Sequence, residues 1–133
     1  MSLNFGALPQ QHEVVTGARA LTKADDRKTL WLTAAAGAEI TLPAPYLGAE
    51  FDLVVGLAFA TTNWTVVTSG SANIISGSVE VAGAVVVAGT EDTVSFVASA
   101  ETIGDHIKLR SNGTVWALSG AAAVSGGITA TTA

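Results

Sequence analysis

Asp105 and His106, with a serine nearby, are the residue types that form a triad for nucleophilic hydrolysis. A triad needs a serine held by the histidine and a histidine oriented by the carboxylate, so it depends on geometry. Adjacent residues in a strand point to opposite faces, which places these two poorly for each other. His106 alternates with Lys108 and Arg110, as expected of a polar strand face. We therefore expect a surface histidine, no catalytic residue and no enzymatic activity.

The sequence also gives little support for a metal or cofactor site. His12 and His106 are the only histidines and the chain has no cysteine, so a set of nitrogen and sulfur ligands for zinc is missing. The acidic pairs at 25–26 and 91–92 lack the spacing of a calcium-binding loop. The chain also lacks a glycine motif for nucleotide phosphates. We expect no metal, no cofactor and no small-molecule substrate.

Two further sets of side chains could act on a ligand. Glu50 and Asp52 share one face of an alternating segment and could serve as paired carboxylates, but a solvated outer strand face is the simpler interpretation. Trp31, Trp64 and Trp116 could form a sugar-binding platform. Because the chain has few aromatic residues, we expect the tryptophans to fill the core instead.

The segments that would position these side chains read as strands. The dipeptide Asn112-Gly113 separates two alternating segments, and it is the strongest short signal for a hairpin, here with a type I′ turn. Other short segments alternate in the same way between glycine, proline and asparagine residues, which predicts an all-β fold, a compact sandwich or barrel of short antiparallel strands. The predicted strands cover 29–34, 38–45, 50–57, 63–67, 93–99, 106–110 and 114–119.

Glycine also recurs every six residues, at Gly77, Gly83 and Gly89. This spacing faintly resembles the hexapeptide repeat of left-handed β-helices, but three hexads would make only about one turn of such a helix. We expect short strands joined at glycine corners instead. Residues 1–20 then form an extended N-terminal arm, residues 21–119 the β-domain, and residues 120–133 an alanine-, glycine-, serine- and threonine-rich segment, either a tail or a piece docked on a neighbouring subunit.

Composition limits the partners of this domain. The chain has 133 residues, of which 49 % are apolar and only 13 % charged, about half the usual ~25 %. Buried interfaces are depleted in charge, so the deficit suggests a surface covered by other subunits. The net charge of −5 and only six lysines and arginines exclude a nucleic-acid footprint. The uncharged stretch 53–79 is too polar to span a membrane, and the N-terminus does not resemble a signal peptide.

The segment "LTKADDRKTLWLTAAAGAEITLPAPYLGAEFDLVVG", residues 21–56, resembles a segment of tailed-phage virion proteins. The segments "ATTNWTVVTSGSANIISGSV" (60–79) and "RSNGTVWALSGAAAVSGGIT" (110–129) resemble small capsid decoration, or cement, proteins of such phages. The resemblance covers most of the chain after residue 20. "TLPAP" segments also occur in phage tail-fibre and spike modules, so a receptor- or carbohydrate-binding module is the alternative.

The resemblance to decoration proteins implies a β-rich, non-enzymatic homotrimer. It would bind the major capsid protein on the outside of the phage head, stabilise contacts between capsomers, and join heads assembled in the host cytoplasm. No functional motif of that family can be transferred residue by residue. The apolar residues Leu3, Phe5 and Leu8 of the predicted arm are the candidate capsid-binding residues.

Overall fold

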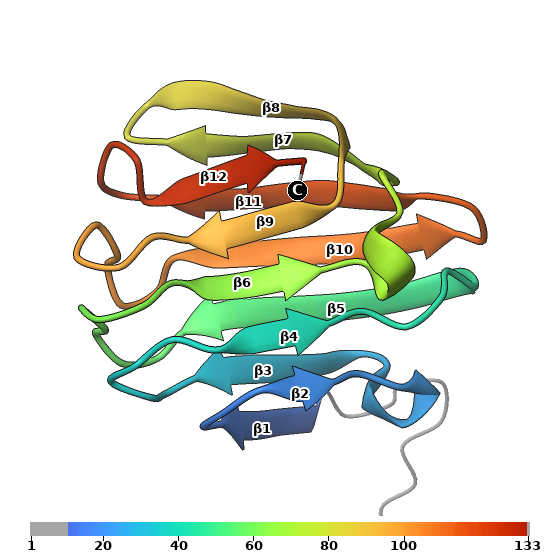
Figure 1. The fold of residues 1–133 in the computed structure, drawn as a ribbon, viewed down its shortest axis with the longest axis horizontal. Helices are drawn as coiled ribbons and strands as arrows, with labels where there is room; N and C mark the ends of the chain where they lie inside the picture. Colours follow the sequence, from blue (N-terminus) through green and yellow to red (C-terminus); the bar gives the residue numbers. More distant parts are fainter. Residues whose placement is uncertain (1–10, 133) are drawn as a thin grey trace, which may run out of the picture.

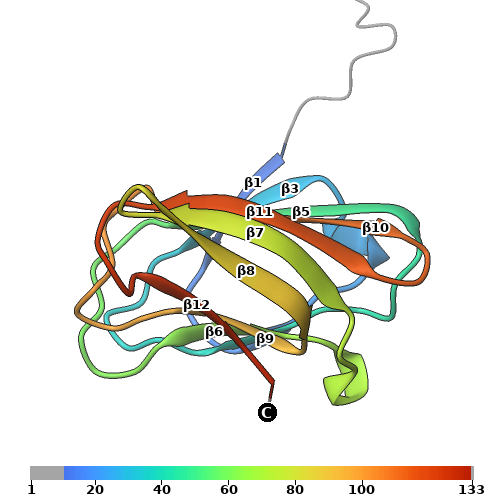
Figure 2. The ribbon, with the colours of Figure 1, turned by 90° about the horizontal axis from the view of Figure 1, so that it is seen from above.

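The computed structural model describes residues 11–132, and these residues form two β-sheets packed face to face (Figure 1, Figure 2). No α-helix occurs within this range; its helical elements are two short 3-10 turns, η1 (Lys23–Asp25) and η2 (Ser69–Ser71). The predicted all-β class is confirmed, and of the two predicted architectures, sandwich or barrel, the two sheets form a sandwich. The predicted capsid-binding residues Leu3, Phe5 and Leu8 lie outside the described residues.

Sheet A has seven strands and sheet B has five. In spatial order, sheet A consists of β1 (Gln11–Val15), β3 (Lys28–Leu32), β5 (Leu47–Val55), β10 (His106–Asn112), β11 (Trp116–Ala122), β7 (Ile75–Val81) and β8 (Ala84–Glu91). Sheet B consists of β12 (Ile128–Thr131), β9 (Thr93–Phe96), β6 (Trp64–Val67), β4 (Glu39–Thr41) and β2 (Arg19–Ala20). The edges of the sandwich are therefore β1 and β8 in one layer and β12 and β2 in the other.

The prediction of antiparallel strands is wrong for half of the strand pairs. Of the ten pairs, the five that join β1 to β3, β3 to β5, β2 to β4, β4 to β6 and β7 to β11 are parallel. From β1 to β6 the chain crosses to the other sheet after every strand, so strands that follow each other within one sheet run the same way. The alternation of apolar residues is the same in both kinds of pair, which is why the sequence pattern did not distinguish them.

Both predicted terminal segments contribute strands to the sandwich. Residues 11–15 form the edge strand β1, paired with β3, and residues 19–20 form β2, so the predicted arm is wrong for 11–20. At the other end, β11 continues to Ala122 and β12 pairs with β9 of the same chain. The C-terminal segment is therefore neither a tail nor a piece docked on a neighbour. Val15 at one end and Ile128 at the other are buried, which explains why these segments dock.

The core lies between the two sheets and is entirely apolar at its centre. Trp116 and Phe51 of sheet A pack with ring centroids 5.8 Å apart, and Trp64 and Phe96 of sheet B belong to the same buried core, all fully buried. The inward residues of each strand alternate with exposed ones, as in β5, where Ala49, Phe51, Leu53 and Val55 are buried. The other fully buried large side chains are Phe59, Leu30, Leu32, Ile40, Leu42, Ile75 and Ile107.

Two hairpins fix the centre and one edge of sheet A. The hairpin predicted at Asn112-Gly113 is confirmed, with β10 and β11 antiparallel, but the turn is not type I′. Only Gly113 has a positive φ, of 101°, while Asn112 Oδ1 accepts the N–H groups of Thr114 and Val115. The two-residue turn of Ala82 and Gly83, in which both φ angles are positive, joins β7 to β8. This is one of the glycine corners expected in the 77–89 segment.

The hairpin of β10 and β11 needs a glycine at position 120, because β10 passes too close there for a side chain. A Cβ atom there would lie 2.3 Å from the carbonyl oxygen of His106 and 3.0 Å from Ile107 Cα, both of which are backbone atoms. We predict that Gly120→Ala lowers the free energy of unfolding by about 1–3 kcal/mol, because the neighbouring strand must move. Gly89→Ala is the control, since a Cβ at Gly89 meets nothing within 4 Å. Chemical denaturation of both variants checks the difference; equal stabilities would contradict the close approach.

Candidate interaction surface

Asp105 and His106, the residue types that suggested a triad, do not form one in the structure. Asp105 is buried, and its Oδ2 and Oδ1 accept the backbone N–H groups of Thr102 (2.9 Å) and Ala123 (3.1 Å). It therefore ties the loop before β10 to the end of β11. His106 is exposed on the outer face of sheet A, where its Nδ1 lies 3.3 Å from the carbonyl oxygen of Gly104. The surface histidine predicted from the sequence is thus observed, and its ring contacts neither Asp105 nor a serine.

The paired carboxylates of β5 lie on the outer face of sheet A, as predicted. Lys108 Nζ lies 3.1 Å from Glu50 Oε1, and Lys108 is also the residue directly opposite Asp52 in β10. Both carboxylates therefore face a cation across the strands on a solvated surface. Among residues 11–132, no group of three or more histidines and acids is placed to hold a metal ion. In the same range no helix is long and apolar enough to cross a bilayer.

The tryptophans divide into two groups. Trp64 and Trp116 are fully buried in the core, as predicted, but Trp31 lies half-buried on the outer face of sheet A. Its indole N–H donates to His12 Nδ1 over 3.0 Å, and the two rings stack with centroids 6.2 Å apart. The interpretation of Trp31 as core filler is wrong, because β3 presents Leu30 and Leu32 inward and Trp31 on the alternate face.

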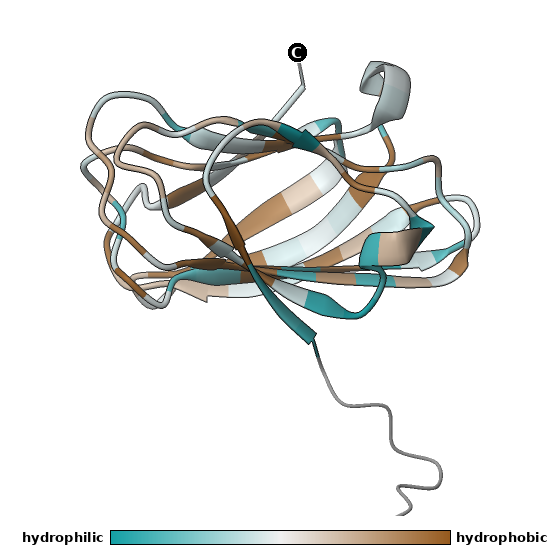
Figure 3. Cartoon of the chain, turned by 90° about the horizontal axis from the view of Figure 1, so that it is seen from below, coloured by the Kyte–Doolittle hydropathy of each residue, from teal (hydrophilic) through white to brown (hydrophobic). Residues whose placement is uncertain are grey.

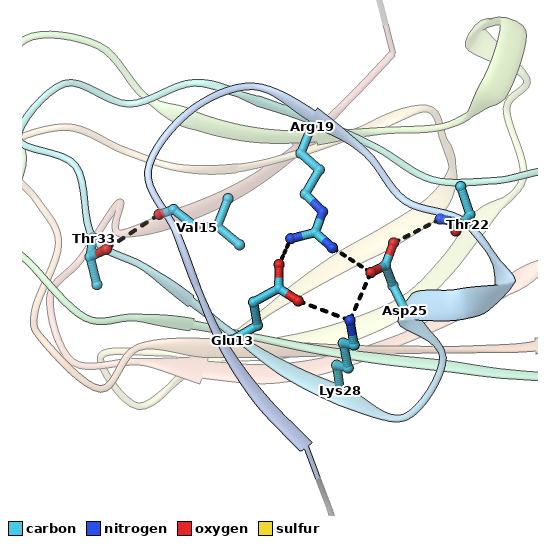
Figure 4. Close-up of polar contacts among 7 residues, drawn as sticks. All are labelled: Glu13, Val15, Arg19, Thr22, Asp25, Lys28 and Thr33. Atoms are coloured by element: carbon cyan, nitrogen blue, oxygen red, sulfur yellow. Dashed lines mark hydrogen bonds and ion pairs between the residues drawn. The ribbon is translucent and has the colours of Figure 1, made fainter.

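A ring of alternating charges joins the first strands of the two sheets, and the sequence analysis did not find it. Arg19 of β2 binds both Glu13 of β1 and Asp25 of η1. Lys28 of β3 binds the same two carboxylates, at 2.8 Å to Glu13 and 3.2 Å to Asp25 (Figure 4). Asp25 is only 4 % exposed, although charged residues cluster around it in the sequence between Arg19 and Lys28. The network connects sheet A to sheet B at the β1–β2 side of the sandwich.

Asp25 remains charged although it is buried. Burial alone would raise the pKa of its carboxyl, but the N–H of Thr22, the Lys28 ammonium and the Arg19 guanidinium together hold the pKa below its ordinary value. Asp25 also completes a capping box with Thr22, whose hydroxyl accepts the Ala24 N–H. The acidic residue thus serves both the network and the 3-10 turn, and its role is to hold the fold.

The contacts described above give no structural role to one remaining surface, the β8 edge, defined here as Ala84–Gly89. Within it, Val85 and Val87 each expose 68 % of their surface, while Ala88 is buried in the core. β8 is the last strand of sheet A, and its 84–90 stretch carries no charge. Figure 2 looks onto this side of the sandwich. Long, uncharged, β-branched edge strands are sites where another strand can add.

The backbone of the β8 edge offers hydrogen-bonding groups as well as apolar side chains. Val81 pairs with Ala84 across the two-residue turn, and such a closing pair exchanges both of its backbone hydrogen bonds. Hydrogen-bonded and non-hydrogen-bonded pairs then alternate along the ladder. Val85 and Val87 fall in non-hydrogen-bonded pairs, so their N–H and C=O groups point away from β7. Beyond the β8 edge, the side chain of Thr132 donates to Thr90 and Glu91, so the end of the chain covers the end of β8.

Charge is distributed unevenly around this surface. Between residues 29 and 107 the sequence has no lysine or arginine, so β4 to β9 carry acids alone. Glu80, opposite Val85 in the ladder, is exposed beside the β8 edge. Four of the six cations lie between residues 19 and 28, at the opposite side of the molecule, where hydrophilic residues gather around β1 and η1 (Figure 3). The sandwich therefore has a charged side and a nearly uncharged side.

No protein-family model matches this sequence, and comparisons with curated proteins and with solved structures found no significant match.

The charge network predicts how stability depends on pH. Because the folded-state pKa of Asp25 is lowered, the stability it contributes is fully present above the unfolded pKa of about 4 and is lost as pH falls through the folded value. We predict that Asp25→Asn lowers the free energy of unfolding by about 1–3 kcal/mol at pH 7. The variant should then lose less stability than the parent between pH 5 and pH 2.

Urea denaturation across that pH range measures both effects. Glu39→Gln is the matched control, because Glu39 is exposed and lies outside the network. The control should follow the parent at every pH. Parallel acid profiles of Asp25→Asn and the parent would show that the carboxylate contributes no pH-dependent stability.

Proposed function

We propose that this protein is a structural virion protein that binds the outer surface of a tailed-phage head as a homotrimer and stabilises contacts between capsomers. The observation that carries the proposal is the nearly uncharged side of the sandwich, which ends at the β8 edge and on which β7 exposes Glu80. A charge-poor surface suits contact with another protein, because the buried cores of protein interfaces are depleted in charged residues. The resemblance of residues 21–56, 60–79 and 110–129 to decoration proteins supports the same assignment.

The part of the outer face of sheet A that is formed by β7, β8 and β11 gives this surface its area. On β7 and β11 it presents Ser78 and Ala117, both exposed, and it continues to Val85 and Val87 at the edge. Small side chains on a sheet let a partner approach closely, so dispersion contacts accumulate over many atoms. The buried Asp105 has a structural role that fits this interpretation, since both of its carboxylate oxygens accept backbone N–H groups and hold two loops together.

A trimer fits these features because cyclic symmetry closes an assembly and lets one patch serve three subunits. A trimer on a capsid also binds through three equivalent contacts, so modest individual affinities combine. The chain of 13.3 kDa should sediment as a species three times that mass. The proposed partner is the major capsid protein, and the proposed location is the exterior of the virion. The assignment of Leu3, Phe5 and Leu8 to the capsid contact stays a prediction.

Binding to heads tests this function directly. We predict that the purified protein co-sediments with phage heads that lack it, and that Ser78→Glu, opposite Val87 in the ladder, lowers the bound fraction at limiting protein by tenfold or more. A new carboxylate on this face would be desolvated at the contact without a partner. Ala60→Glu, at an exposed loop residue, is the matched control and should bind like the parent. Absence of the parent protein from the head fraction would contradict the proposal.

Trp31 supports a second candidate, a tail-fibre or spike module that binds carbohydrate. It is the one tryptophan on the outer face, and an aromatic ring on a flat surface can stack against a sugar. Its indole N–H is already used by His12. For this function, glycans should change the tryptophan fluorescence of the parent but not of Trp31→Phe. The buried Trp64 and Trp116 give a constant background in both proteins.

A further inference from the structure

We propose that the β8 edge accepts residues 2–7 of a second copy of this chain as an additional β-strand. The inference concerns contacts between subunits and does not depend on binding to a phage head. It begins from the outward N–H and C=O groups of Val85 and Val87, which an added strand would pair, and from their two exposed side chains. Strand addition of this kind gains affinity from the backbone and specificity from alternate side chains.

The β8 edge differs from the other three edges of the sandwich. β1 carries His12 and Glu13, which engage Trp31 and the charge network, and β2 is two residues long. β12 is four residues long and is only partly exposed. Charges and short lengths are the means by which edge strands avoid unwanted pairing. β8 is eight residues long and lacks both protections over Ala84–Thr90.

The length of the chain before Gln11 shows that the added strand comes from another copy. Ten residues span at most about 35 Å when fully extended. The segment starts at β1, and β8 lies at the opposite edge of the same seven-stranded sheet. Six intervals between strands amount to about 29 Å. If five residues lie along β8, the remaining five reach only about 17 Å, so a chain cannot fill its own β8 edge.

The sequence of this segment suits an added strand. In "SLNFGA", residues 2–7, Leu3, Phe5 and Ala7 alternate with Ser2, Asn4 and Gly6. Pro9 follows, and proline ends a ladder because it has no N–H. With Leu3 and Phe5 on the outer face, their side chains would lie next to Val85 and Val87. Aromatic and β-branched neighbours across strands stabilise a sheet.

The two partners in this contact are different surfaces, so the interface is heterologous. The donor segment leaves one edge of sheet A and the acceptor is its other edge, which allows each copy to give one strand and receive one. A heterologous contact that closes produces a ring, and three copies would give the proposed trimer. The inference assigns Leu3 and Phe5 to a second copy, whereas the sequence analysis assigned them to the capsid.

Cross-linking between two single-cysteine chains tests the contact, because the parent chain has no cysteine. Chains carrying Leu3→Cys or Phe5→Cys are mixed with tagged chains carrying Val85→Cys or Val87→Cys and treated with a short bismaleimide, which tolerates different registers. We expect tagged heterodimers with the β8 variants. Leu47→Cys is the control acceptor, since Leu47 is 82 % exposed and lies away from β8. No heterodimer, or equal yields with Leu47→Cys, would overturn the inference.

Sedimentation equilibrium of the free protein provides a second readout. Deletion of residues 2–8, and separately the double variant Val85→Lys/Val87→Lys, should each raise the dissociation constant of the assembly at least tenfold. Leu47→Lys should leave it unchanged, and circular dichroism should show the same fold in all variants. A double variant that assembles like the parent would overturn the β8 assignment. A parent that is monomeric at micromolar concentration would overturn both this contact and the trimer, while co-sedimentation with heads would still test the proposed function.

Discussion

Burial of two apolar sheet faces against each other is the interaction on which the rest of this structure depends. The chain has no disulfide, so the packing around Trp64, Trp116 and Phe51 must hold the layers together. The indole N–H groups of Trp64 and Trp116 are buried without a hydrogen-bond partner in the described structure. Each unpaired group costs about 1–3 kcal/mol, but burying 150–250 Å² of each ring contributes about 4–6 kcal/mol, so packing outweighs the lost hydrogen bond.

The same two-layer arrangement determines where the molecule can interact. Once both inner faces are buried, only the outer faces, the loops and the four edges remain for contacts. Glu13 and Arg19 join the layers at the β1–β2 side, where their charges are paired within the chain. Among the described residues the opposite side has no equivalent network; there β12 of the second sheet lies close to β8, and Thr132 donates to Thr90 and Glu91. The fold therefore leaves one edge closed by charge and one edge open.

Local alternation predicted the all-β class, the β10–β11 hairpin and the outward position of His106, because these depend on period-two burial and on one turn. It could not predict that β1, β3 and β5 run parallel, since strand direction depends on crossovers between layers that leave no mark on the alternation. The charge network could not be predicted from the sequence either. Glu13 and Lys28 are fifteen residues apart and meet only because β1 lies beside β3. The valines of the β8 edge are exposed because β8 is the last strand of sheet A, and the sequence alone does not specify that order.

The uneven charge distribution also decides which edges can meet when copies assemble. Joining two β8 edges would bring Glu80 of one copy towards Glu80 of the next, and this side has no lysine or arginine to compensate. Joining a β8 edge to the β1 side brings Glu80 to the side that carries the exposed Lys23 and Arg27, neither of which takes part in the network of Arg19 and Lys28. Such exposed charges are screened within about 8 Å at physiological salt, so they orient the encounter more than they hold it. The backbone ladder and the valines would then supply the affinity, and the charges would select head-to-tail order over a symmetric pair of β8 edges.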